Sequence, residues 1–228
     1  MDIVNLIKAI TAVITTIMAL VVGFRVLTLN PANWLNRWFM LFFISSSLGF
    51  LTYTIYHLIT NNSDIIIPLM VTAHIFFNFA IVSLMMTVFI LEKFAKVAMS
   101  LQYFGTMMVL FLVMSLGYFI WVPKLDMDSY EQDIVNTTTP RGWFIFVNVL
   151  RIVMSLYVVY KYIMMTRKIE KKTKKRIQWF SIGVIIVVIA LFINVTAGFF
   201  RPIETVIEVM ALIAIDVGSL AIFKGFLI

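Results

Sequence analysis

Seven long runs of apolar residues divide the chain, and short polar stretches separate them. The runs cover residues 4–27, 38–60, 65–91, 97–121, 143–165, 179–200 and 202–226. A helix that spans a bilayer needs roughly 20 mostly apolar residues, and each run meets this length. The runs lack the alternation typical of barrel strands, and in lipid the backbone is otherwise satisfied only within helices. The pattern predicts an all-α membrane protein, a single domain over residues 1–228 that forms a seven-transmembrane-helix bundle.

The composition supports a location in the membrane. Hydrophobic residues make up 62% of the 228 residues and the mean hydropathy is +1.03, whereas soluble domains are roughly 45–50% apolar. The first run has no basic leader and no cleavage pattern, so we expect it to remain as the first helix. The chain contains no cysteine, which excludes disulfides and thiolate chemistry. We expect an integral, multi-pass protein of the cell membrane.

Lysine and arginine fall mainly between alternate runs. The joints after the first, third and fifth runs hold Arg25 and Arg37, Lys93 and Lys96, and the basic segment 167–176. Short loops rich in Lys and Arg stay on the cytoplasmic side of a membrane. The pattern therefore predicts an external N-terminus and a cytoplasmic C-terminus.

The basic segment, "RKIEKKTKKR", carries seven basic residues and one acidic residue, a net charge of +6 against +7 for the whole chain. Its basic residues are Arg167, Lys168, Lys171, Lys172, Lys174, Lys175 and Arg176. Each Lys or Arg near a membrane surface is worth about 1 kcal/mol of attraction to anionic headgroups. We therefore expect contact with the lipid bilayer, with a cytoplasmic effector as the other possible partner. Nucleic acid is not expected, because no aromatic residues alternate with these charges.

Polar side chains inside the runs gather toward the external ends. Ionisable groups within spanning helices usually face the interior of the bundle and are candidate functional residues. The candidate ligand-binding set is His57, His74, Asn78, Asn148, Arg151, Asn194, Glu204 and Glu208. Arg151 needs a carboxylate or a water-filled cavity, and by depth Glu208 is the expected partner, with Glu204 as the second choice. The set forms either a ligand or ion cavity or a network that only fixes the packing.

Asp216 lies deeper in the last run than the two glutamates. An ionised carboxylate without a partner is too costly in hydrocarbon. We therefore expect Asp216 to be a buried, protonated residue with a hydrogen bond to the second run. The candidate partners there are Ser45, Ser46, Ser47 and Thr52.

Several seven-helix families are disfavoured by particular residues. Retinal proteins need a lysine near the middle of the last helix, and this chain has only Lys224, at the inner end. Zinc hydrolases with seven helices use three histidines, and this chain has two. G-protein-coupled receptors share only the expected topology. We therefore expect neither a cofactor or metal nor an enzymatic activity.

In length, number of runs and orientation, the chain resembles the seven-helix sensor regions that precede histidine kinases and diguanylate cyclases in bacteria and archaea. The resemblance covers the whole chain and rests on architecture rather than on a motif. It implies a receptor or sensor that binds a small polar ligand or ion and signals to a separate cytoplasmic partner. Two alternatives stay open: a small ion or proton transporter or channel that uses the same carboxylates, and a structural membrane protein. The oligomeric state is not predicted.

Overall fold

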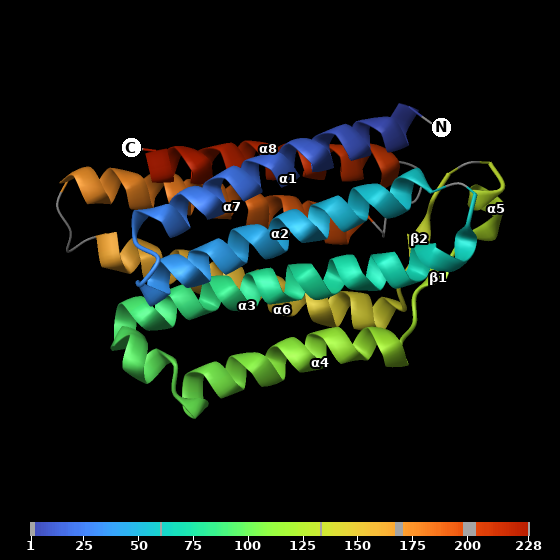
Figure 1. Ribbon diagram of the computed structural model, residues 1–228. Coiled ribbons are helices and arrows are strands. Elements are labelled where there is room, and N and C mark those ends of the chain that lie inside the picture. Colours follow the sequence, from blue (N-terminus) through green and yellow to red (C-terminus); the bar gives the residue numbers. More distant parts are fainter. Residues whose placement is uncertain (1–2, 60, 133, 167–170, 198–203, 228) are drawn as a thin grey trace.

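The computed structural model describes residues 3–59, 61–132, 134–166, 171–197 and 204–227. The long helices are α1 Ile3–Leu29, α2 Trp34–Leu58, α3 Ile66–Ala98, α4 Thr106–Ile120, α6 Arg141–Thr166, α7 Lys171–Ala197 and α8 Glu204–Leu227. The short elements are a 3₁₀ turn Ser63–Ile65 (η1), a π-helix Leu101–Gly105 (η2), α5 Met127–Tyr130, and the strands β1 Lys124–Leu125 and β2 Thr137–Thr138. The long helices lie side by side along one direction, and the two termini lie at opposite ends of the bundle (Figure 1).

Five helical segments of the described chain are long and apolar enough to cross a membrane. They are Ala9–Leu29, Trp34–Leu58, Ser63–Ala98, Leu101–Ile120 and Arg141–Met165. Their outer sides are also apolar: Ile17 of α1 and Leu116 of α4, for example, are 56% and 55% exposed. Soluble proteins rarely expose large apolar surfaces of this kind. The fold therefore agrees with the predicted all-α, integral membrane protein.

Each predicted run contains a long helix, but several helix ends differ from the prediction. Helix α2 begins at Trp34 rather than at residue 38, because the side chain of Asn33 caps it and accepts a hydrogen bond from the Leu35 amide at 2.9 Å. Helix α7 begins at Lys171 rather than at residue 179. Lysine and arginine favour a helix almost as well as alanine does, so a helix can extend past its apolar run.

Helix α3 is the central helix of the bundle. It packs against α2, α4 and α6, and every residue from 80 to 88 is buried. A helix that is apolar on all sides is expected in such a position. Near its C-terminal end α3 is kinked at Phe94, which has φ 61° and ψ 158° and whose side chain is 80% exposed.

Helices α7 and α8 approach each other closely at their glycines. A Cβ atom added to Gly183 of α7 would lie 2.4 Å from the carbonyl oxygen of Gly218 in α8. A Cβ atom added to Gly225, two turns farther along α8, would lie 2.8 Å from the carbonyl oxygen of Arg176. Small residues let two backbones approach in this way within a membrane. The two helices therefore pack as one unit, and α8 also packs along α1.

The loop between α4 and α6 is folded, although the sequence predicted no structure there. Strands β1 and β2 pair antiparallel, and Asp126 caps α5 by accepting hydrogen bonds from Ser129. These bonds hold the pKa of the Asp126 carboxyl below its ordinary value of 3.8. Val135 is buried in a cluster with Tyr56, Ile66, Met70 and Ala73. The loop therefore covers one end of α2 and α3.

Candidate functional site

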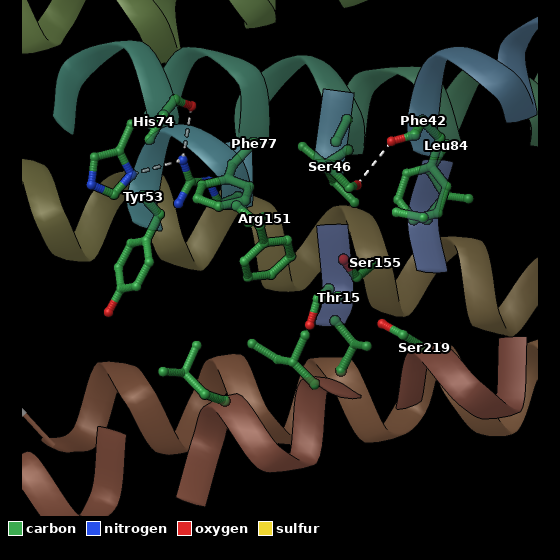
Figure 2. Close-up of a pocket in the computed structure, with 18 of the residues that line it drawn as sticks. Thr15, Phe42, Ser46, Tyr53, His74, Phe77, Leu84, Arg151, Ser155 and Ser219 are labelled. Carbon is green, nitrogen blue, oxygen red and sulfur yellow. Dashed lines mark hydrogen bonds between the residues drawn. The ribbon is translucent and has the colours of Figure 1, made fainter. Parts of the chain in front are cut away.

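A cavity of about 300 Å³ lies inside the bundle, near the lower end of the range for ligand sites. Side chains from α1, α2, α3, α6, α7 and α8 line it, together with two threonines of the folded loop. The polar lining residues are Thr15, Ser46, Tyr53, Tyr56, His74, Thr137, Thr139, Asn148, Arg151, Ser155 and Ser219. Figure 2 shows His74, Tyr53 and Arg151 toward one end and Thr15, Ser155 and Ser219 farther along. The other lining residues are mostly apolar, so the cavity is amphipathic.

Arg151 is the one charged residue among the described residues of the cavity wall, and its side chain is only 6% exposed. Its Nε and Nη2 atoms donate to Oδ1 of Asn78 at 3.0 and 2.7 Å. Nη2 also donates to the carbonyl oxygen of His74 at 3.2 Å, and Nη1 donates to Oδ1 of Asn148 at 3.5 Å. A guanidinium stays protonated in proteins. Within the described chain, this buried positive charge is thus hydrogen-bonded to neutral groups.

Asn78 positions Arg151 and does not line the cavity. Its side chain is fully buried, and its amide nitrogen donates to the carbonyl oxygen of Met114 at 2.9 Å and to the hydroxyl of Ser115 at 3.3 Å. Both acceptors belong to α4, whereas the amide oxygen faces Arg151 of α6. One asparagine therefore joins three helices and fixes the direction of the guanidinium.

His74 stands beside Arg151 at the cavity wall. Its Nδ1 atom lies 3.4 Å from Nη2 of Arg151. A guanidinium can only donate, so Nδ1 is the acceptor and the neutral ring carries its hydrogen on Nε2, an assignment that follows from this contact. The ring stacks on Tyr118 with centroids 4.8 Å apart and planes at 8°. Tyr118 is itself buried, with its side chain 1% exposed.

The predicted ion pair of Arg151 with a glutamate stays a prediction. Glu204 and Glu208 belong to the first turns of α8, and Asn194 belongs to α7, but their side chains lie outside the described residues. Position 208 precedes Leu212 by one helical turn, and Leu212 lines the cavity. The sequence therefore places Glu208 one turn beyond a cavity-lining residue.

His57 lies apart from Arg151. Its Nδ1 atom is 2.9 Å from the carbonyl oxygen of Tyr53, and its ring centroid lies 4.1 and 4.2 Å from those of Tyr53 and Tyr56. Both tyrosines line the cavity, and His57 is not among the lining residues. Of the predicted candidates with described side chains, the cavity wall contains His74, Asn148 and Arg151.

The partner predicted for Asp216 is wrong. The partly buried Asp216 accepts a hydrogen bond from Thr15 of α1. Three of the four predicted hydroxyls of α2 bond elsewhere: Ser46 to Phe42, Ser47 to Thr16 and Thr52 to Leu48. The reason is the packing order, since α8 lies against α1 and α7. The carboxyl of Asp216 thus links the last helix to the first.

The basic segment is described in part. Arg167 and Lys168 lie outside the described residues, as do the side chains of Lys171 and Lys172. Lys174, Lys175 and Arg176 are exposed near the start of α7. Its predicted contact with lipid or an effector stays a prediction.

Sequence reasoning missed the hydroxyl groups of the cavity, above all Ser155 and Ser219. Serine and threonine are common in membrane helices, so their presence alone is no signal. One signal was available, since Ser155 follows Arg151 by four residues and therefore lies on the same face of α6.

Among the described residues, the cavity wall shows no grouping typical of a metal centre. Within the described ranges, no three histidine, cysteine, aspartate or glutamate side chains gather closely enough to hold a metal ion. Comparison of the sequence with protein-family models gives no match, and comparison with curated proteins gives none either. The function of the chain is therefore inferred from the chemistry of the cavity.

Proposed function

We propose that the chain crosses the membrane seven times, with the N-terminus outside and the C-terminus in the cytoplasm, as a receptor or sensor for a small polar or anionic ligand. Two observations support this topology. Five helical segments have the length and composition of membrane spans. The Lys-rich and Arg-rich joints follow alternate helices, which favours their location on the cytoplasmic side.

The observation that carries the ligand-binding role is the position of Arg151 in the wall of the cavity. If the polar network served packing alone, we would expect other side chains to surround the guanidinium and to leave no cavity beside it. Here the guanidinium borders a space of about 300 Å³, and its described hydrogen-bond partners are neutral. A charge inside a membrane protein usually marks a binding site or an ion path.

Two helix pairs contribute side chains to the wall of this cavity. Helices α3 and α6 are joined by polar bonds at three levels: Asn78 to Arg151, Thr87 to Tyr162 at 2.9 Å, and Glu92 to Lys161 at 2.6 Å. Helices α7 and α8 are joined by the glycine contact. A ligand between the pairs can therefore move one pair relative to the other.

The basic segment connects α6 to α7, and so connects the two pairs. Movement of the α7–α8 pair would change the position of this segment. A cytoplasmic effector that docks on the segment could respond to that movement, and anionic headgroups are the other partner for the same charges.

A cavity-filling variant tests the ligand-binding role. We would purify the protein in lipid nanodiscs and measure its unfolding temperature with a panel of small organic acids, amines, alcohols and sugars. Ser155→Leu places a larger side chain in the cavity. The matched control is Val153→Leu, since Val153 is 56% exposed on the outer side of α6. A receptor predicts that some panel compound stabilises the wild type and the control but not Ser155→Leu.

The competing transporter function has its own test in liposomes. If the purified protein carried protons or sodium ions across the membrane, and Glu208→Gln abolished that flux, the receptor proposal would be wrong. It would also be wrong if no panel compound acted through the cavity.

A further inference from the structure

The cavity has two polar zones, separated along its length. The outer zone consists of Arg151, His74 and Asn148, and the inner zone consists of Ser155 and Ser219. In Figure 2 the labelled hydroxyls of Ser155 and Ser219 lie away from the His74 end. Ser155 follows Arg151 by four residues in α6, so the two zones lie about 6 Å apart along the helix.

The outer zone offers hydrogen-bond donors and a positive charge. Nη1 of Arg151 donates a long bond of 3.5 Å to Asn148. His74 presents Nε2 as a further donor, because its Nδ1 faces the guanidinium. Two donors beside a buried positive charge match a carboxylate.

The inner zone offers two hydroxyls, those of Ser155 and Ser219, that make no hydrogen bond to another described residue. Ser155 is 5% exposed. A serine in a helix often bonds to the carbonyl group one turn earlier, as Ser46 does with Phe42 at 2.8 Å. The inner hydroxyls therefore remain available to a polar group of a ligand.

Apolar side chains form most of the remaining cavity wall. Phe77 of α3, Ile81 of α3 and Ile215 of α8 are among them. A volume of about 300 Å³ corresponds to about ten water molecules. The cavity thus suits a compact molecule rather than a lipid chain.

We propose that the cavity binds a small organic acid with an apolar body, whose carboxylate pairs with Arg151 and His74 and whose second polar group meets Ser155 and Ser219. The inference rests on the proposed ligand-binding function and adds the chemical class of the ligand. An aromatic body suits the ring of Phe77 in the wall. Recognition at both ends distinguishes such an acid from a simple fatty acid and from an amine.

Four related probes test the class. They are 4-hydroxyphenylacetate, phenylacetate, 4-(2-hydroxyethyl)phenol and tyramine, which share one ring and differ in charge or in the ring hydroxyl. We would measure their affinity for the full chain in nanodiscs by calorimetry. The proposal predicts that 4-hydroxyphenylacetate binds best. Phenylacetate should bind about three- to tenfold more weakly, because it loses the inner hydrogen bond, and the neutral and cationic probes should bind more weakly still.

Ser155→Ala tests the inner zone. It should reduce the advantage of 4-hydroxyphenylacetate over phenylacetate and leave the affinity for phenylacetate unchanged, because phenylacetate has no group that reaches Ser155. Val153→Ala, on the outer side of α6, is the matched control and should keep the full difference. An equal loss for both acids in Ser155→Ala would overturn the inner contact.

The results also separate this inference from the proposed function. If panel compounds bind through the cavity and the four probes show no preference for the acids, the ligand class is wrong and the receptor function stands. If the preference for acids appears only in the Glu208→Gln variant, Glu208 itself pairs with Arg151 in the wild type. The proposed ligand class is then also wrong. If no compound of either set acts through the cavity, both proposals are wrong.

Discussion

Arg151 of α6 donates two hydrogen bonds to a single atom, Oδ1 of Asn78 in α3, at 3.0 and 2.7 Å. Removing that atom leaves a buried guanidinium with fewer acceptors. We expect Asn78→Leu to lower the free energy of unfolding by about 3 kcal/mol, since a hydrogen bond to a charged group is worth about 1.5–3 kcal/mol. Unfolding of the purified protein in mixed detergent micelles would measure the change.

Ser83 provides the control for that experiment. It is fully buried in the same helix, and its hydroxyl has no hydrogen-bond partner in the described chain. Ser83→Ala should change the free energy of unfolding by no more than about 0.5 kcal/mol. An equal decrease in the free energy of unfolding in both variants would show that α3 is sensitive to any substitution. The hydrogen bonds of Asn78 would then make no particular contribution to stability.

The glycine contact between α7 and α8 predicts opposite effects for two Gly→Ala substitutions. A Cβ atom on Gly218 would lie 2.8 Å from the carbonyl oxygen of Gly183, whereas a Cβ atom on Gly142 would meet nothing within 4 Å. Gly218→Ala should therefore destabilise the protein by about 1–3 kcal/mol through overpacking. Gly142→Ala should stabilise it by up to about 1 kcal/mol, because alanine favours a helix. Thermal unfolding of the two variants would measure both changes in stability. If the two changes had the same sign, the predicted effect of the glycine contact would be wrong.

The folded loop predicts a pH dependence at Asp126. Hydrogen bonds from Ser129 hold the pKa of this carboxyl below 3.8. A carboxyl whose pKa is lowered by folding stabilises the folded loop above its unfolded pKa, and this contribution is lost as the pH falls through the lowered pKa. The cap of α5 should therefore persist down to about pH 4 and weaken below it. Carbon-13 NMR titration should give a pKa below 3.8 in the wild type and a higher pKa in Ser129→Ala.

The proposed movement of the α7–α8 pair predicts which distances change when a ligand binds. The chain has no cysteine, so spin labels can be attached at introduced cysteines. Lys96 of α3, Lys175 of α7 and Met164 of α6 are exposed positions near the proposed cytoplasmic end. With 4-hydroxyphenylacetate, the distance between labels at Lys96→Cys and Lys175→Cys should change, and the distance between Lys96→Cys and Met164→Cys should stay constant. A change in the second distance alone would contradict the proposed movement.

The helices could be predicted from the sequence because their apolar runs are long, but their ends could not. Helix α7, for example, begins at Lys171, in a stretch where almost every residue is charged. Hydropathy gives no signal for the start of a helix there. His74, Asn78 and Arg151 could be grouped by depth, and the structure brings them into contact. The Thr15 partner of Asp216 could not be predicted, since depth along a helix does not reveal which helices are neighbours. The position of the Ser155 and Ser219 hydroxyls at the cavity also depends on which helices are neighbours, so it could not be predicted either.

The kink at Phe94 has a consequence for how the chain fits the bilayer. From Ile66 to Lys93, α3 is 28 residues long, or about 42 Å, which matches the thickness of a bilayer with its headgroups, about 40–45 Å. A straight continuation would carry the helix into the cytoplasm. At Phe94 the backbone instead adopts φ 61°, a conformation that costs about 1–3 kcal/mol outside glycine. In the proposed topology, Phe94 therefore marks the depth at which α3 ends at the inner membrane surface and the chain turns along it toward α4.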